Sequence, residues 1–102
     1  MDRMAMLKEF LTANPSDSFA RYGLAMEYSK AGDTVSALAE FTKLLEANPD
    51  YTAAYQMAGQ VLMKAARNHE ARTMLERGIA SATRTGNAHA KSEMQAMLEE
   101  LE

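Results

Sequence analysis

The sequence contains no cysteine and no tryptophan, and only two prolines and five glycines in 102 residues. Without cysteine there is no disulfide framework, no thiolate nucleophile and no cysteine-based metal site. No run reaches the length of about 20 apolar residues that a membrane-spanning helix needs. The charged start, residues 1–10, lacks the apolar core of a secretory signal. We therefore expect a cytoplasmic protein with no membrane partner.

Strong charge is also missing. The formal net charge is −3, the pI is about 5.4, and the basic residues are scattered. A nucleic-acid-binding protein normally shows a basic patch, so nucleic acid is not an expected partner. What the chain has instead is a 47% apolar share with nine methionines, arranged periodically. This composition predicts one helical domain over 1–102.

A periodic pattern runs through the chain, and the stretch 18–51 is its clearest copy. A forward shift by one period places Ala20, Lys30, Ala31 and Ala37 on Ala54, Lys64, Ala65 and Ala71. The backward shift places Leu45, Ala47, Asn48 and Pro49 on Leu11, Ala13, Asn14 and Pro15. A fixed period of this length, about 34 residues, indicates a repeat array.

Each copy has the pattern of two amphipathic helices. In the first copy one apolar stripe runs over 19–31 and a second over 35–45. Gly32 suits the end of the first helix, and Asp33 suits the N-cap of the second. The small residues Ala25 and Ala37 let the two helices approach closely.

The remaining segments predict four more helices, six in all. They cover 2–13, a stretch from about 51 to 65, another beginning near 68, and 88–101. Gly86 suits the break before the last helix, which we expect to cover the apolar face of the second copy. The expected N-caps are Ser16 or Asp17, Asp50, Asn68 and Asn87.

These copies resemble the tetratricopeptide repeat family. The residues that carry the resemblance are Leu24, Ala25, Tyr28, Gly32, Ala37, Phe41 and Pro49, then Tyr55, Gly59, Leu62, Ala71, Leu75 and Gly78. The chain departs from the family at Arg21, where Trp is favoured, at Leu44, where a small residue is favoured, and at Thr83, where Pro is favoured. The last departure predicts that the second repeat runs on differently.

The resemblance implies an all-α fold, a right-handed α-solenoid of two helix pairs with an extra helix at each end. The expected divisions are an N-terminal capping helix (1–15), a first repeat (16–49), a second repeat (50–85) and a C-terminal capping helix (86–102). It also implies a non-catalytic module that binds a partner peptide or helix in a concave groove. The alternative is a structural protein that self-associates as a homodimer.

A surplus apolar stripe supports the groove. Phe19, Tyr22 and Met26 lie three and four residues apart, on a different side of their helix from Leu24 and Tyr28. Carried over from the family, the predicted groove residues are Phe19, Tyr22, Met26, Ser29 and Lys30, then Ala53, Gln56, Gln60, Met63 and Lys64. The alternative is that a terminal helix covers this stripe and that the two lysines are simply solvated helix ends.

No constellation of residues indicates catalysis, a cofactor or a metal. His69 and His89 are twenty residues apart, and Glu70 and Glu93 complete no ligand motif with them. Some relatives clamp a C-terminal carboxylate pair with Lys and Asn in the groove. Tyr22 and Met26 stand at those places here, so that clamp is not expected.

Overall fold

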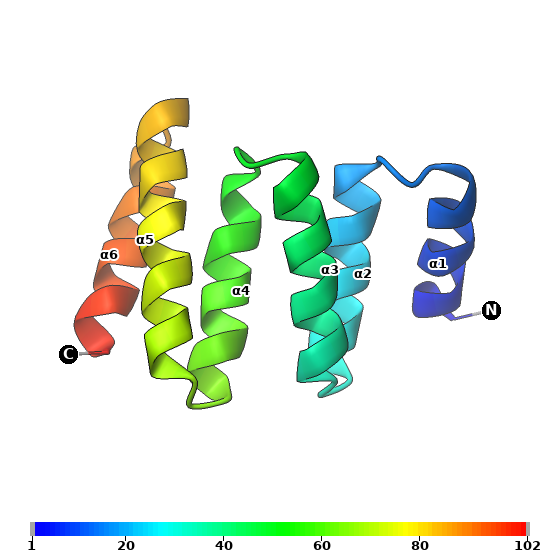
Figure 1. Cartoon of the computed structure of the whole chain (residues 1–102), viewed down its shortest axis with the longest axis horizontal. Coiled ribbons are helices and arrows are strands. Elements are labelled where there is room, and N and C mark those ends of the chain that lie inside the picture. The colour runs from blue at the N-terminus through cyan, green and yellow to red at the C-terminus, as the bar shows by residue number, and fades with distance from the viewer. Residues whose placement is uncertain (1, 102) are drawn as a thin grey trace. The chain divides into compact units, whose positions relative to one another are not determined.

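The computed structural model describes residues 2–101 and folds them into six α-helices, with no strand in that range (Figure 1). The helices are α1 (Arg3–Ala13), α2 (Ser18–Lys30), α3 (Thr34–Ala47), α4 (Thr52–Lys64), α5 (Asn68–Thr85) and α6 (Ala88–Glu100). The predicted all-α helical-repeat fold is confirmed. Met1 and Glu102, which the predicted domain includes, lie outside the described residues. None of the described helices is both long and apolar enough to cross a membrane.

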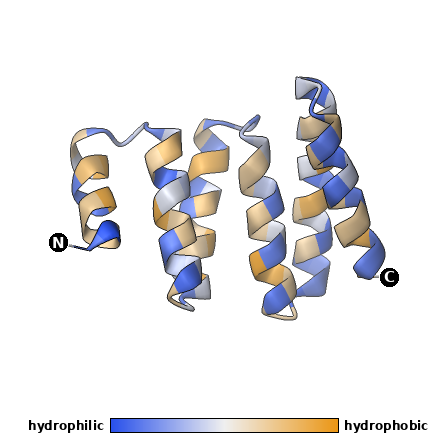
Figure 2. Ribbon diagram, turned by 180° about the vertical axis from the view of Figure 1, so that it is seen from behind, coloured by the Kyte–Doolittle hydropathy of each residue, from blue (hydrophilic) through white to orange (hydrophobic). Residues whose placement is uncertain are grey.

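The chain divides into two compact units, the N-terminal unit Met1–Asn48 and the C-terminal unit Pro49–Glu102. Every helix in both units carries apolar and polar residues along its length (Figure 2). In each unit the apolar sides face the neighbouring helices, and they form that unit's core.

Side-chain oxygens cap four helices. The carboxylates of Asp2, Asp17 and Asp33 accept backbone N–H bonds at 2.7, 2.9 and 3.1 Å, and the Asn87 side chain accepts one at 3.0 Å. The predicted caps Asp33 and Asn87 are therefore confirmed, and of the two candidates Ser16 and Asp17, it is Asp17 that caps α2. At Asp33, hydrogen bonds from the side chain and backbone of Ser36 favour the ionised form and lower the pKa of the carboxyl group.

Two predicted caps are wrong. The N-cap of α4 is Tyr51, which makes no side-chain cap bond, and the Asp50 carboxylate pairs with Arg84 at 2.8 Å. Asn68 is the first residue of α5, and its N-cap is Arg67. The Arg67 guanidinium hydrogen-bonds the Glu70 carboxylate at 2.6 and 2.9 Å, which lowers the pKa of Glu70. Both helix starts thus lack a side-chain cap and have an ion pair nearby.

In the N-terminal unit, α2 packs against both α1 and α3. Ala25, Ala37 and Phe41 are all fully buried, as expected for a close contact between α2 and α3. Arg21, at the place where the family favours Trp, forms a largely buried ion pair with Glu40 at 2.6 Å. On the other side, an apolar cluster joins α1 to α2. Its members are Leu11, Ala20 and Leu24, with Met4, Leu7 and Tyr28 at the edge.

In the C-terminal unit, α5 packs against α4 and α6, and α6 also touches α4. A Cβ atom on Gly78 would collide with the sulfur of Met94 and, at 2.6 Å, with Cβ of Tyr55. The absence of a side chain at Gly78 therefore creates the recess in which Met94 is fully buried. Thus α6 packs on the second helix pair, as predicted for the last helix.

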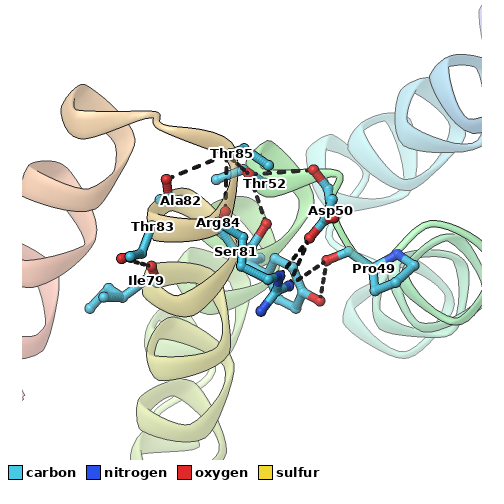
Figure 3. Close-up of polar contacts among 10 residues, drawn as sticks. Pro49, Asp50, Thr52, Ile79, Ser81, Ala82, Thr83, Arg84 and Thr85 are labelled. Carbon is cyan, nitrogen blue, oxygen red and sulfur yellow. Dashed lines mark hydrogen bonds and ion pairs between the residues drawn. The ribbon is translucent and has the colours of Figure 1, made fainter.

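The second repeat does run on differently. α5 has 18 residues where α3 has 14, and it continues past Thr83. The added turn brings Thr85 to the start of α4, where Thr52 and Ser81 share a buried hydrogen bond of 2.8 Å (Figure 3). Arg84 reaches Asp50 from the same turn. These hydroxyl and ionic contacts hold the extended end of α5 against α4.

The turns inside the two helix pairs share one backbone geometry but differ in residue type. Gly32 has φ 80° at the turn between α2 and α3, and Ala66 has φ 59° at the turn between α4 and α5. The two positions coincide when the first repeat is shifted onto the second. Because a Cβ atom disfavours this left-handed conformation, the second turn is strained and the first is not.

Candidate functional site

The N-terminal unit has a hollow on the exposed side of α2. Its volume is about 310 Å³, and four predicted groove residues line it, Phe19, Tyr22, Met26 and Lys30. Spacings of three and four place these side chains on one face of the helix. Three further residues complete the lining, Arg3 from the start of α1 and Gly23 and Glu27 from α2. Ser29, the fifth residue predicted for this side, does not line the hollow.

The apolar residues that line this hollow differ in how exposed they are. Phe19 is 75% exposed, whereas Tyr22 and Met26 are partly buried. The Tyr22 ring meets the buried Phe41 ring edge-on, with centroids 6.2 Å apart and planes at 66°. Tyr22 therefore contributes to the internal packing of the unit as well as to the lining of the hollow. The high exposure of Phe19 shows that α1 does not cover that end of the stripe.

Charge gathers at the other end of this hollow. One oxygen of Glu27 lies 3.4 Å from Arg3 Nε and 3.4 Å from Lys30 Nζ. The Glu27 side chain is 19% exposed, whereas both cations are well exposed. Two exposed cations thus share one largely buried carboxylate at the edge of an apolar surface.

The C-terminal unit has a comparable hollow between α4 and α6, with a volume of about 390 Å³. Three predicted groove residues line it, Gln60, Met63 and Lys64, together with Met97 and Glu100 of α6. Gln56 lies elsewhere on α4 and donates a long hydrogen bond of 3.4 Å to Glu93. Ala53 borders a separate hollow at the start of α4 with Thr52 and Asn87.

The two histidines lie apart from these hollows. His89 is exposed beside Glu93 at 3.2 Å, and His69 is exposed at the start of α5. No group of three or more His, Asp or Glu side chains between residues 2 and 101 is placed to hold a metal ion.

Sequence reasoning missed the lining residues that come from the terminal helices. Arg3, Met97 and Glu100 reach the hollows only because α1 and α6 pack with particular rotations. Glu27 could have been found, because a carboxylate three residues before Lys30 is a recognisable helical pair.

Comparison with known proteins adds to this geometry. The model of the tetratricopeptide repeat family matches residues 28–98. A TPR repeat-containing protein of Pseudomonas aeruginosa is 29% identical over 96 residues, covering 94% of this chain and 91% of its own. The solution structure of a tetratricopeptide repeat domain protein from Salinibacter ruber is 34% identical, with a TM-score of 0.81, over 86% of this chain and 89% of that one.

The fold extends to more distant structures. The TPR2B domain of yeast Sti1, solved as a complex with pHsp70, superposes with a TM-score of 0.89 at 16% identity, over 96% of this chain and 78% of that one. At this identity the likeness concerns the fold alone. Since the family model covers more than half of the sequence and the helices pack as its repeats predict, this chain belongs to the tetratricopeptide repeat family.

Proposed function

We propose that this protein is a non-catalytic protein-interaction module. It binds a partner peptide or helix on the exposed side of α2 or of α4, the first helices of the two repeats. The observation that carries the proposal is Phe19, a large apolar side chain that is 75% exposed at the edge of a hollow. Exposed aromatic side chains beside concave surfaces are frequent anchors of protein interfaces. The Sti1 domain, which shares the fold, was solved with a bound partner.

Each unit offers a candidate binding surface of its own. The N-terminal unit offers Phe19, Tyr22, Met26 and Lys30, and the C-terminal unit offers Gln60, Met63 and Lys64. Gln56 is included in the proposed surface because rotation of its amide away from Glu93 costs only one long, exposed hydrogen bond. The surface of the N-terminal unit is mostly apolar with a cation at one end, which suits an amphipathic segment, and the surface of the C-terminal unit is mostly polar.

The test uses a displayed library of random peptides, panned on the full chain. Recovered peptides should bind Phe19→Ala about 5- to 30-fold more weakly than wild type, because interface anchors contribute about 1–2 kcal/mol or more. The melting temperature should stay nearly unchanged. Val35→Ala is the matched control, because Val35 is 78% exposed on α3 and does not line the hollow. The proposal is refuted if Phe19→Ala binds the recovered peptides as tightly as Val35→Ala does.

Self-association is a second candidate, favoured by a different surface. Apolar residues occur along α1 (Figure 2), and two of them, Met6 and Phe10, remain 57% and 46% exposed. A homodimer would bury them, since exposed apolar patches often mark contact sites. Sedimentation equilibrium of wild type and Phe10→Ser separates the candidates. A dimer that Phe10→Ser dissociates supports self-association, and a monomer at all concentrations excludes it.

A further inference from the structure

The two hollows differ in charge. In the N-terminal hollow, Arg3 and Lys30 outnumber the single carboxylate of Glu27, which leaves one net positive charge. In the C-terminal hollow, Lys64 is balanced by Glu100. Lys30 and Lys64 occupy the same place in the two repeats, in the last turn of a first helix. The charge difference therefore comes from the terminal helices, which contribute Arg3 on one side and Glu100 on the other.

Apolar and charged residues lie at opposite ends of the N-terminal hollow. Phe19 lies in the first turn of α2, Met26 lies two turns further on, and Lys30 ends the helix. Arg3 joins Lys30 through the shared oxygen of Glu27. The surface is thus apolar at one end and cationic at the other, and a ligand that matches both ends has a defined orientation.

We propose that the N-terminal hollow recognises an acidic peptide segment in which a carboxylate lies close in sequence to a bulky apolar side chain. The apolar side chain packs on Phe19 and Met26, and the carboxylate lies between Arg3 and Lys30. This inference rests on the proposed interaction function and adds the chemistry of the partner. Arg3, which lies outside both repeats, is the residue that sets the preference for an acid.

Glu27 affects the proposed binding of an acid in two ways, and the second of them provides a test. The Glu27 carboxylate lies 3.4 Å from both cations, so an incoming acid meets two cationic groups at the same end of the hollow. Glu27 also weakens the attraction, since it neutralises one of the two charges. Removal of Glu27 should therefore strengthen binding of an acidic peptide, an effect that damage to the fold would not produce.

The experiment starts from the peptides recovered by panning on the full chain. Each acidic peptide is resynthesised with its carboxylate replaced by the amide, and both forms are titrated against the variants. On wild type the amide form should bind about two- to fivefold more weakly, the size expected for an exposed ion pair. Arg3→Gln should abolish this difference. Glu27→Gln should enlarge it, with the acidic form binding more tightly than on wild type.

Lys43→Gln is the matched control, because Lys43 pairs with Glu40 in the same unit and does not line this hollow. It should leave the difference between the two peptide forms unchanged. The inference is overturned if acidic residues are not enriched, or if Arg3→Gln and Lys43→Gln behave alike. Apolar peptides that need Phe19 without any acidic preference would end this inference and keep the proposed function. Recovery of no peptide that depends on Phe19 would end both.

Discussion

The two units hold their terminal helices in different ways. In the N-terminal unit α1 packs mainly on α2, and its Leu7 side chain lies at an ordinary 3.5 Å from the place where a Cβ of Gly23 would be. In the C-terminal unit α6 packs on both α4 and α5, and Met94 is fully buried in the recess at Gly78. Both contacts contain a glycine, and the difference teaches that the deeper anchoring goes with the one that has no room for a side chain, Gly78.

The same terminal helices determine the difference in charge between the two hollows. α1 contributes a cation to the N-terminal hollow, whereas α6 contributes Met97 and a carboxylate to the C-terminal one. The lysine at the end of each first helix repeats, but its surroundings do not. A helix that lies outside the repeats therefore sets the charge of the hollow beside each repeat.

The largest expected effect concerns the anchors of the terminal helices. Met94→Ala should lower the free energy of unfolding by about 2–5 kcal/mol, because it leaves a cavity at a fully buried site. Leu7→Ala should cost clearly less, since Leu7 is only partly buried. Urea denaturation of both variants measures the difference. Equal losses would show that α1 and α6 are anchored equally well.

The next prediction compares the two glycines at these contacts. Gly78→Ala should destabilise the protein by about 1–3 kcal/mol, because the new methyl group overlaps Tyr55 and Met94. Gly23→Ala should be neutral or stabilising by up to about 1 kcal/mol, since alanine favours the helix and meets only ordinary contacts. Thermal denaturation provides the comparison. A stable Gly78→Ala variant would contradict the close approach of α6.

A smaller effect is expected at the two turns. Ala66→Gly should raise the free energy of unfolding by up to about 1 kcal/mol, because it relieves the left-handed strain and loses only part of this gain to the greater freedom of the unfolded chain. Gly32→Ala introduces the same strain in the other unit and should destabilise it. Thermal denaturation of both variants provides the measurement. If both variants lose stability, the turn at Ala66 is not strained.

The smallest effect is on acid stability. The pKa of Asp33 and the pKa of Glu70 are lowered in the folded protein, by Ser36 and by Arg67 respectively. Each group therefore contributes stability that is present above its unfolded pKa, near 4, and is lost as the pH falls through its folded pKa. Asp33→Asn keeps a capping oxygen but cannot titrate, so its stability should depend less on pH below about 4. Urea denaturation at several acidic pH values measures the slope, and an unchanged slope would contradict the lowered pKa.

Most of the fold could be predicted because it depends on local patterns. The repeat period, the apolar stripes and the short polar residues before them located six helices and the caps at Asp17, Asp33 and Asn87. The caps at Asp50 and Asn68 were wrong for different reasons. Asp50 pairs with Arg84, which lies far along the chain in the last turn of α5. Arg67 and Glu70 instead form a local pair at the start of α5.

The candidate site could be predicted only where it lies on one helix. The spacing of Phe19, Met26 and Lys30 fixes their shared face, and the structure places all three in one hollow. The contact between Tyr22 and Phe41, and the approach of Arg3, depend on how neighbouring helices rotate and pack. Such rotations follow from the whole core rather than from the residues of one helix.

Because α1 packs mainly on α2, it is the helix that cleavage of the chain would most readily separate from the N-terminal unit. Residues 14–17 form a short tether with Pro15 inside it, and this tether keeps α1 at an effective concentration on the order of millimolar beside α2. A modest interface is enough for docking under that condition. Cleavage of the tether would turn α1 into a separate peptide that dissociates on dilution and returns when added in excess. The N-terminal unit is thus suited to fragment complementation, in which α2 and α3 recover their missing helix from solution.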